Sequence, residues 1–192
     1  PDLMSVAKGL TSAYYPVSSC LVSDKVWEVL LEGSRAGKVV AFGHGNTYCG
    51  NPVGAATALA NIALIEREGL VGNADAVGEH MAKRLKDAFE DHPLVGEVRG
   101  LGLYHAVELA KDKKNKVGFD WDLNISHRLY DRCKEEGLIL HCAWPNTPAC
   151  NSAMLAPPIC ITRDEVDEIV ARLKRGIDGL QDDLLREGLW NG

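Results

Sequence analysis

The hydrophobic positions at the start of this chain form short continuous runs separated by turn residues. Leu3–Ala7 and residues 17–22 are such runs, and each is typical of a short buried strand. The turn residues between them, 14–16, predict that the two strands lie side by side. Ser23 can then cap a helix that ends by Gly37.

Residues 43–52 are rich in Gly and small polar side chains, which predicts a loop, and a helix follows it. Asn51 is a favourable N-cap, and Pro52 suits the first helical position. The Ala-rich sequence up to Glu66 has high helix propensity, and Gly69 can end the helix. Because small side chains let another backbone approach closely, we expect this helix to be buried under a sheet or at an interface.

After Gly69 the chain becomes more charged and more amphipathic. Apolar residues four positions apart predict a helix over 74–89, and residues 95–109 alternate around several glycines, which predicts a bulged pair of strands. Thr162 and Glu165 form a capping-box pattern that opens a C-terminal amphipathic helix. The other expected elements are a helix over 122–136 and strands over 138–143 and 152–156. This order predicts an α+β unit that follows a domain boundary near residue 72.

The composition favours an ordinary globular protein and excludes several classes of partner. Of the 192 residues, 46% are hydrophobic and 25% are charged, and the net charge of −6 argues against a nucleic-acid partner. The densest basic run, residues 111–116, also contains an acidic residue, so we interpret it as a solvated loop. No apolar stretch approaches the roughly 20 residues that span a bilayer, so no membrane partner is expected.

Several kinds of catalytic or structural site lack the residues they need. The six cysteines show no Cys-x-x-Cys pair, and we interpret them as reduced thiols of a cytoplasmic protein. The histidines are scattered without metal-ligand spacing, so no metal site is predicted. A serine hydrolase is excluded as well, because the chain has no Gly-x-Ser-x-Gly segment.

Lys8 is the candidate for covalent chemistry. It follows an apolar run and precedes Gly9, which places an amine at the end of a buried strand. Desolvation favours the neutral form of an amine, and a neutral amine is a nucleophile that can form an imine. The alternative is a strand-end lysine whose head group extends into solvent, and this segment alone favours that alternative.

The Gly-rich loop over residues 43–51 is a candidate anion site. Its backbone N–H groups, the Thr47 hydroxyl and the N-terminus of the following helix suit a phosphate. Gly-rich loops are common before helices, however, and this one matches neither the nucleotide P-loop nor the dinucleotide fingerprint.

Four segments, taken in order, resemble signatures of the class III pyridoxal-phosphate aminotransferases, a branch of the fold type I superfamily. Residues 7–11 resemble the family's lysine segment, and residues 43–52 resemble its threonine-containing segment before a helix. Residues 98–103 and 155–158 resemble two signatures of its small domain. The resemblance covers essentially all 192 residues.

The resemblance implies a transaminase that moves an amino group from an amine or ω-amino acid to an oxo acid. Lys8 is then the catalytic residue, which forms a Schiff base with pyridoxal 5'-phosphate (PLP) and carries a proton. Thr47 and Asn46 are expected to bind the cofactor, with Thr47 reaching the phosphate in the neighbouring subunit of a homodimer. Gly45 and Tyr15 are expected at the substrate.

The fold implied by the resemblance is α/β. Residues 1–72 correspond to the end of the large PLP-transferase domain, and residues 73–192 correspond to the small C-terminal α+β domain. In the family, the residues around the cofactor ring precede the lysine, so we expect this chain to be the C-terminal part of a longer protein. The alternatives are another fold type I enzyme (an aminomutase, racemase or decarboxylase) and an inactive fragment.

One position departs from the family pattern. Many members carry an arginine shortly before the fourth signature, where it receives the substrate carboxylate, and the aligned residue here is Thr147. Arg99 is the nearest alternative in the small domain, although structural ion pairing is the competing interpretation. The amino donor and acceptor are therefore left open.

Overall fold

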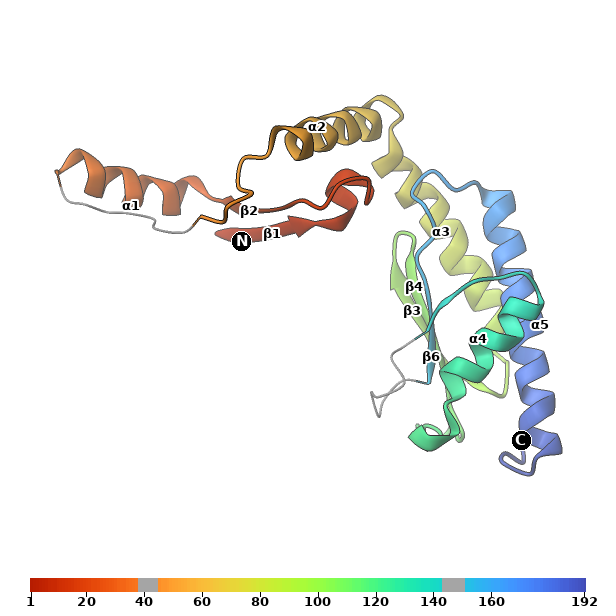
Figure 1. Cartoon of the computed structure of the whole chain (residues 1–192). Helices are drawn as coiled ribbons and strands as arrows, with labels where there is room; N and C mark the ends of the chain where they lie inside the picture. Colours follow the sequence, from red (N-terminus) through yellow and green to blue (C-terminus); the bar gives the residue numbers. More distant parts are fainter. Residues whose placement is uncertain (38–44, 143–150) are drawn as a thin grey trace. The chain divides into compact units, whose positions relative to one another are not determined.

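The chain forms two compact units, Pro1–Gly69 and Leu70–Gly192. The computed structural model describes residues 1–37, 45–142 and 151–192 (Figure 1). In these ranges, no helix combines the length and the hydropathy that crossing a membrane would require. The apolar residues 39–42 of the sequence lie outside the described residues.

The first unit begins with an antiparallel hairpin. Strand β1 (Leu3–Ala7) pairs with β2 (Ser18–Val22), with Leu3 opposite Val22 and Ala7 opposite Ser18, which confirms the predicted strand pair. A 3-10 turn, η1 (Lys8–Thr11), follows β1 directly. The predicted burial of β1 is wrong for this structure: Leu3 is 58% exposed, because the neighbouring helix packs against η1 and not over the strands.

Helices α1 (Asp24–Arg35) and α2 (Pro52–Arg67) complete the first unit. The predicted N-cap of α2 is confirmed, since the Asn51 side chain accepts hydrogen bonds from the backbone N–H groups of Val53 (3.0 Å) and Gly54 (3.4 Å). Only Gly54 of α2 is buried. The expected burial of the whole small-residue helix is therefore not found among the described residues.

The second unit contains one antiparallel sheet, which two helices contact, and the C-terminal helix packs mainly against those two helices (Figure 1). The strand order is β3 (Val95–Leu101), β4 (Tyr104–Leu109), β6 (Ser152–Leu155) and β5 (His141–Cys142). A bulge between Val95 and Glu97 confirms the predicted irregular strand pair. The predicted helix over 122–136 is divided at Asn124, whose φ of 48° is left-handed. The elements of this unit are α3 (Leu70–Phe89), β3 (Val95–Leu101), β4 (Tyr104–Leu109), η2 (Trp121–Leu123), α4 (Ile125–Glu135), β5 (His141–Cys142), β6 (Ser152–Leu155) and α5 (Arg163–Arg186).

The apolar stripes predicted from the sequence form the core of the second unit. Met81, Leu85 and Phe89 of α3 are fully buried, and the inward side chains of α5 join them in one cluster. The capping box is also confirmed, because the Thr162 side chain accepts from the Glu165 N–H while the Glu165 carboxylate accepts from the Thr162 N–H.

Helices α4 and α5 approach closely at a buried glycine. A Cβ on Gly176 would lie 2.5 Å from Cys133 Sγ and 3.2 Å from Cys133 Cα. The contact also buries the thiol, and burial raises the pKa of Cys133 to about 12. A Cβ on Gly179, one turn further along α5, would lie 3.5 Å from Arg132 Cδ, which is ordinary van der Waals contact.

Two alanine substitutions in α5 should therefore have opposite effects. Gly176→Ala should lower the free energy of unfolding by about 1–3 kcal/mol, because the added methyl overpacks the contact with Cys133. Gly179→Ala should raise it by about 0.5–1 kcal/mol, because alanine loses less backbone entropy on folding. Urea unfolding of both variants measures the difference; equal effects would contradict this packing.

A neutral histidine links the end of α3 to α5. His92 is 8% exposed, its Nδ1 accepts from the Leu94 N–H (3.2 Å), and its Nε2 therefore donates to Asp178 Oδ1 (3.1 Å). Burial is the largest effect on the ring and lowers the pKa of His92 below its ordinary value of 6.5, although Asp178 opposes this shift. The positive charges of Lys174 and Lys113 act with burial.

The lowered pKa predicts a pH-dependent stability. The folded state binds fewer protons at His92 than the unfolded state. The contribution of neutral His92 to the free energy of unfolding is therefore complete above pH 6.5, and it is lost as the pH falls through the folded pKa. His92→Asn keeps an acceptor for the Leu94 N–H but does not titrate. Urea unfolding between about pH 8 and pH 5 should show a shallower pH slope for this variant, and an unchanged slope would refute the assignment.

Candidate active site

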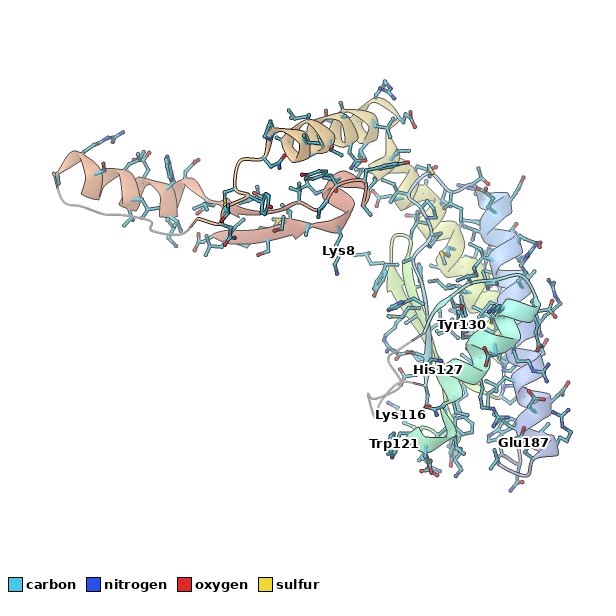
Figure 2. All side chains as sticks on the ribbon, viewed as in Figure 1. Lys8, Lys116, Trp121, His127, Tyr130 and Glu187 are labelled. Carbon is cyan, nitrogen blue, oxygen red and sulfur yellow. The ribbon has the colours of Figure 1, made fainter. Side chains whose placement is uncertain are left out.

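Lys8 lies on a strained backbone turn at the end of β1. Its φ is 54°, in the left-handed region, whereas the preceding Ala7 is extended. The side chain is exposed and projects outward from the hairpin (Figure 2). Among the described residues its amine forms no hydrogen bond or ion pair, so it is available to a ligand.

The turn that begins at Lys8 contains two more left-handed residues, Ser12 (φ 48°) and Ala13 (φ 61°). Backbone bonds from the Ser12 N–H to Gly9 O (3.3 Å) and from the Ala13 N–H to Lys8 O (3.4 Å) close it. Each left-handed residue other than glycine costs about 1 kcal/mol or more, so surrounding contacts must stabilise this conformation.

Tyr15, the expected substrate residue, lies at the end of the same turn. The buried hydroxyl of Thr11 donates to Tyr15 O at 2.6 Å. The Tyr15 ring packs on α2, where a Cβ on Gly54 would lie 3.2 Å from its Cδ1 and would also collide with Val17. The hairpin can approach α2 this closely only because position 54 has no side chain; a substrate role for Tyr15 stays a prediction.

The expected cofactor residues Asn46 and Thr47 lie in an exposed turn before α2. The Asn46 N–H donates to Cys49 Sγ (3.1 Å), and the Cys49 N–H donates to Asn46 O (2.9 Å). Gly45 is exposed beside them, and the Thr47 hydroxyl makes no hydrogen bond to a described residue. His44 and Gly43 lie outside the described residues.

Within one chain, these groups form two separate site elements. No hydrogen bond or ion pair of the described residues joins the Lys8 turn to residues 45–47. The helix N-terminus expected to bind an anion is also partly occupied, because Asn51 already accepts from the N–H groups of Val53 and Gly54. The Thr47 hydroxyl is a free donor at this end of α2.

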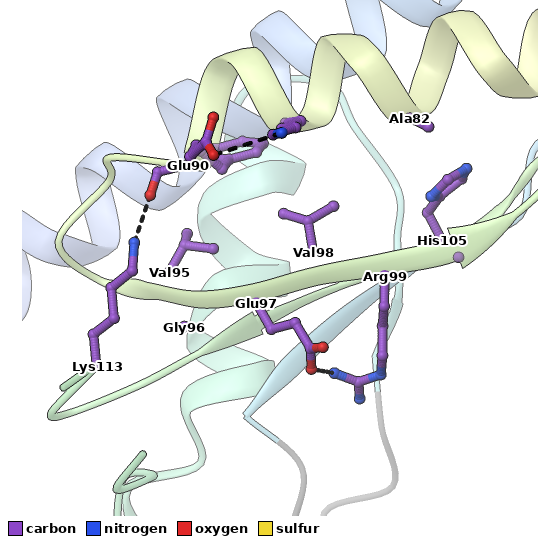
Figure 3. Close-up of a pocket in the computed structure, with 12 residues that line it drawn as sticks. Ala82, Glu90, Val95, Gly96, Glu97, Val98, Arg99, His105 and Lys113 are labelled. Carbon is purple, nitrogen blue, oxygen red and sulfur yellow. Dashed lines mark hydrogen bonds and ion pairs between the residues drawn. The ribbon is translucent and has the colours of Figure 1, made fainter. Parts of the chain in front are cut away.

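The second unit contains a groove of about 530 Å³ between α3 and β3. Val95 and Val98 point toward the helix, while Glu97 and Arg99 lie on the other side of the strand (Figure 3). Arg99 pairs with Glu97 at 2.9 Å and also with Glu108. These pairs support the structural interpretation of Arg99; Thr147, the other residue considered for a substrate carboxylate, lies outside the described residues.

The polar groups of this groove largely bind one another. Lys113 Nζ donates to Glu90 O at 2.6 Å, and His105 Nε2 bonds with Gly102 O at 2.8 Å. His105 Nδ1 is buried without a partner, but it lies against Gly100, where even a Cβ would collide with it. The groove therefore offers a ligand little free hydrogen-bonding capacity. Elsewhere in the described ranges, no group of three or more His, Cys, Asp or Glu residues could hold a metal ion.

Comparison with known proteins identifies the family of the chain. A family model described as aminotransferase class-III matches residues 1–177. The chain belongs to the class III aminotransferase family. Members of this family depend on PLP.

Named relatives of this class III chain are transaminases. It is 46% identical over 188 residues to a diaminobutyrate–2-oxoglutarate transaminase of Halomonas elongata, covering 98% of this chain and 39% of the relative. It is 36% identical over 179 residues to a putrescine–pyruvate aminotransferase of Pseudomonas aeruginosa, covering 93% and 36%. The chain thus spans less than half the length of these relatives.

Solved structures give the same result. A transaminase obtained by directed evolution and ancestral reconstruction has a TM-score of 0.88 and 47% identity, over 96% of this chain and 39% of the other. The ω-transaminase of Pseudomonas jessenii in complex with PMP has a TM-score of 0.81 and 34% identity, over 95% and 38%. The α/β fold of the class III chain is therefore that of PLP-dependent transaminases.

The available groups of this aminotransferase chain fit PLP. An exposed, unpaired amine at Lys8 suits its aldehyde, and the unpaired hydroxyl of Thr47 suits its phosphate. A lysine already paired with a carboxylate, or a threonine bonded to its own helix, would not leave these groups free.

Asn61 is a further residue of interest in this aminotransferase chain that the sequence patterns did not identify. The expected packing face of α2 consists of small residues, and Asn61 is the polar side chain among them that contacts the Lys8 turn. A carboxamide among the small residues of α2 is the signal that could have identified it.

Proposed function

We propose that this chain is part of a PLP-dependent enzyme that transfers an amino group from an amine or ω-amino acid to an oxo acid. The observation that supports this most directly is the free amine of Lys8 on a constrained turn that directly follows β1. We further propose that residues 1–72 belong to the large cofactor-binding domain and residues 73–192 to the small one.

Lys8 would bind the cofactor and then act as the proton carrier. PLP, when bound, supplies an electrophilic carbon for amines and an electron sink for the carbon next to the amino group. Once the Lys8 amine is released from the cofactor, its Nζ would accept the proton from the substrate carbon next to the amino group. Nζ would then donate that proton to the exocyclic carbon of the cofactor. The fixed backbone at Lys8 limits the positions that Nζ can reach, which favours directed proton movement.

The turn before α2 would hold the cofactor phosphate. Thr47 Oγ1 would donate to a phosphate oxygen, with Asn46 beside it, and Gly45 would leave room for substrate. Because no described contact joins this turn to Lys8 of the same chain, we propose that it serves the site of a second subunit in a homodimer.

The named relatives narrow the proposed substrates. Diaminobutyrate and putrescine, named for two of them, both carry a terminal primary amine, and the named acceptors, 2-oxoglutarate and pyruvate, are 2-oxo acids. We propose the same classes of donor and acceptor here. The exposed thiols of Cys20, Cys49 and Cys160, which form no disulfide, support a reducing compartment and hence a cytoplasmic location.

Replacement of Lys8 tests the proposed attachment. The intact protein is incubated with PLP and reduced with borohydride, and mass spectrometry locates the added mass. The label should lie on Lys8, and Lys8→Ala should abolish both the label and amino transfer from a diamine to 2-oxoglutarate. Lys25→Ala, which removes an amine paired with Asp2 (3.2 Å), should retain both.

Retention of label and turnover in Lys8→Ala would refute the function. A normal label on Lys8 without net amino transfer to any oxo acid would instead assign the chain to another fold type I reaction.

Replacement of Thr47 tests the phosphate contact. Thr47→Ala should raise the dissociation constant of PLP by about tenfold or more, because a hydrogen bond to a charged group contributes about 1.5–3 kcal/mol. Thr57→Ala is the control, since the Thr57 hydroxyl donates to Val53 O of its own helix at 2.8 Å. Equal PLP affinities for the two variants would contradict the assignment.

A further inference from the structure

We propose that Asn61 is a positioning residue for Lys8, acting through the backbone turn that follows the lysine. This inference rests on the proposed role of Lys8. Asn61 lies in the middle of α2, and its side chain touches the turn and not the lysine amine.

The Asn61 carboxamide forms three hydrogen bonds to the turn, which together are called the clasp. Its Nδ2 donates to Gly9 O at 2.9 Å and to Leu10 O at 3.2 Å. Its Oδ1 accepts from Ser12 Oγ at 2.7 Å. Both donors and the acceptor of one half-buried side chain are therefore used on residues within four positions of Lys8.

The turn needs this restraint because its backbone is strained and the bonds next to Lys8 are long. The internal bonds to the carbonyls of Lys8 and Gly9 are long, at 3.4 and 3.3 Å, whereas the shorter bonds of the turn (3.0 and 2.6 Å) lie beyond them, at Thr11. Lys8, Ser12 and Ala13 are all left-handed. Left-handed residues other than glycine persist only where neighbouring structure over-determines them. Asn61 supplies that restraint from a regular helix.

The clasp controls the direction of the Lys8 side chain, and so the position of its amine, because backbone conformation sets the direction of the Cα–Cβ bond. Lys8 directly precedes Gly9, whose carbonyl Asn61 binds. If the turn relaxed, Lys8 would move from the left-handed region toward an extended or right-handed conformation, and its side chain would leave the strand in a different direction. Misplacement of a reacting group by about 1 Å can cost about a hundredfold in rate.

Asn61→Asp is a sharp test, because aspartate has nearly the same shape but cannot donate. It would place a carboxylate against the carbonyl oxygens of Gly9 and Leu10. Asn73 provides a matched control in the second unit. Its Nδ2 bridges Ile159 O (2.8 Å) and Ile161 O (3.1 Å) in the same manner, so Asn73→Asp has the same chemical change without contact to Lys8.

The deciding measurement is the reactivity of Lys8 in the intact protein stripped of PLP. The protein is treated with trace acetic anhydride, and mass spectrometry gives the acetylation rate of Lys8 relative to Lys25 in the same molecule. Asn61→Asp should change this ratio by about threefold or more, and Asn73→Asp should leave it at the wild-type value. Because no cofactor is present, the result does not depend on whether Lys8 binds PLP.

A second variant and a second readout keep the proposal testable if Asn61→Asp fails to fold. Asn61→Ala removes the clasp without adding charge and should change the Lys8 ratio in the same direction. With PLP bound, it should lower kcat about tenfold while the KM of the donor changes little. A wild-type Lys8 ratio in folded Asn61 variants would overturn the inference, even if Lys8 is confirmed as the site of PLP attachment.

Discussion

The left-handed backbone at Lys8 is the constraint on which the first unit depends. A long side chain in this region is costly, and it is stable only when other groups fix the chain on both sides. Helix α2 provides both restraints: Asn61 bonds the turn after Lys8, and the missing side chain at Gly54 lets Tyr15 and Val17 pack closely. The same helix carries the Thr47 turn at its N-terminus. One helix thus supports both elements of the candidate site.

The two units obtain their stability in different ways. The second unit has a continuous core built from α3, α5 and the sheet, in which Met81, Leu173 and Ile177 are fully buried. The first unit has almost no buried apolar side chains among its described residues, and polar contacts with close backbone approach define its geometry. The residues assigned to chemistry lie in this less densely packed unit, where specific hydrogen bonds determine the direction of a side chain.

The sequence predicted those features that depend on neighbouring residues. The strand pair around residues 14–16, the Asn51 cap and the Thr162–Glu165 capping box are local patterns, and the structure has all three. Burial of Leu3 was predicted wrongly, because an apolar run does not indicate which element will cover it. The role of Asn61 was missed because its partner Gly9 lies 52 positions away in the chain.

Packing and hydrogen bonding on α2 are also coupled, which explains why a small-residue face contains one asparagine. Gly54 and Asn61 are seven residues apart, two helical turns, and so lie on the same face. The asparagine side chain is short, and its carboxamide reaches the carbonyls of Gly9 and Leu10 only if the two backbones come close. Glycine at position 54 permits that approach, and Asn61 uses it to determine the conformation of the turn. A larger residue at position 54 would separate the backbones and move Asn61 away from the turn. The orientation of the Lys8 amine therefore depends on the absence of a side chain at position 54.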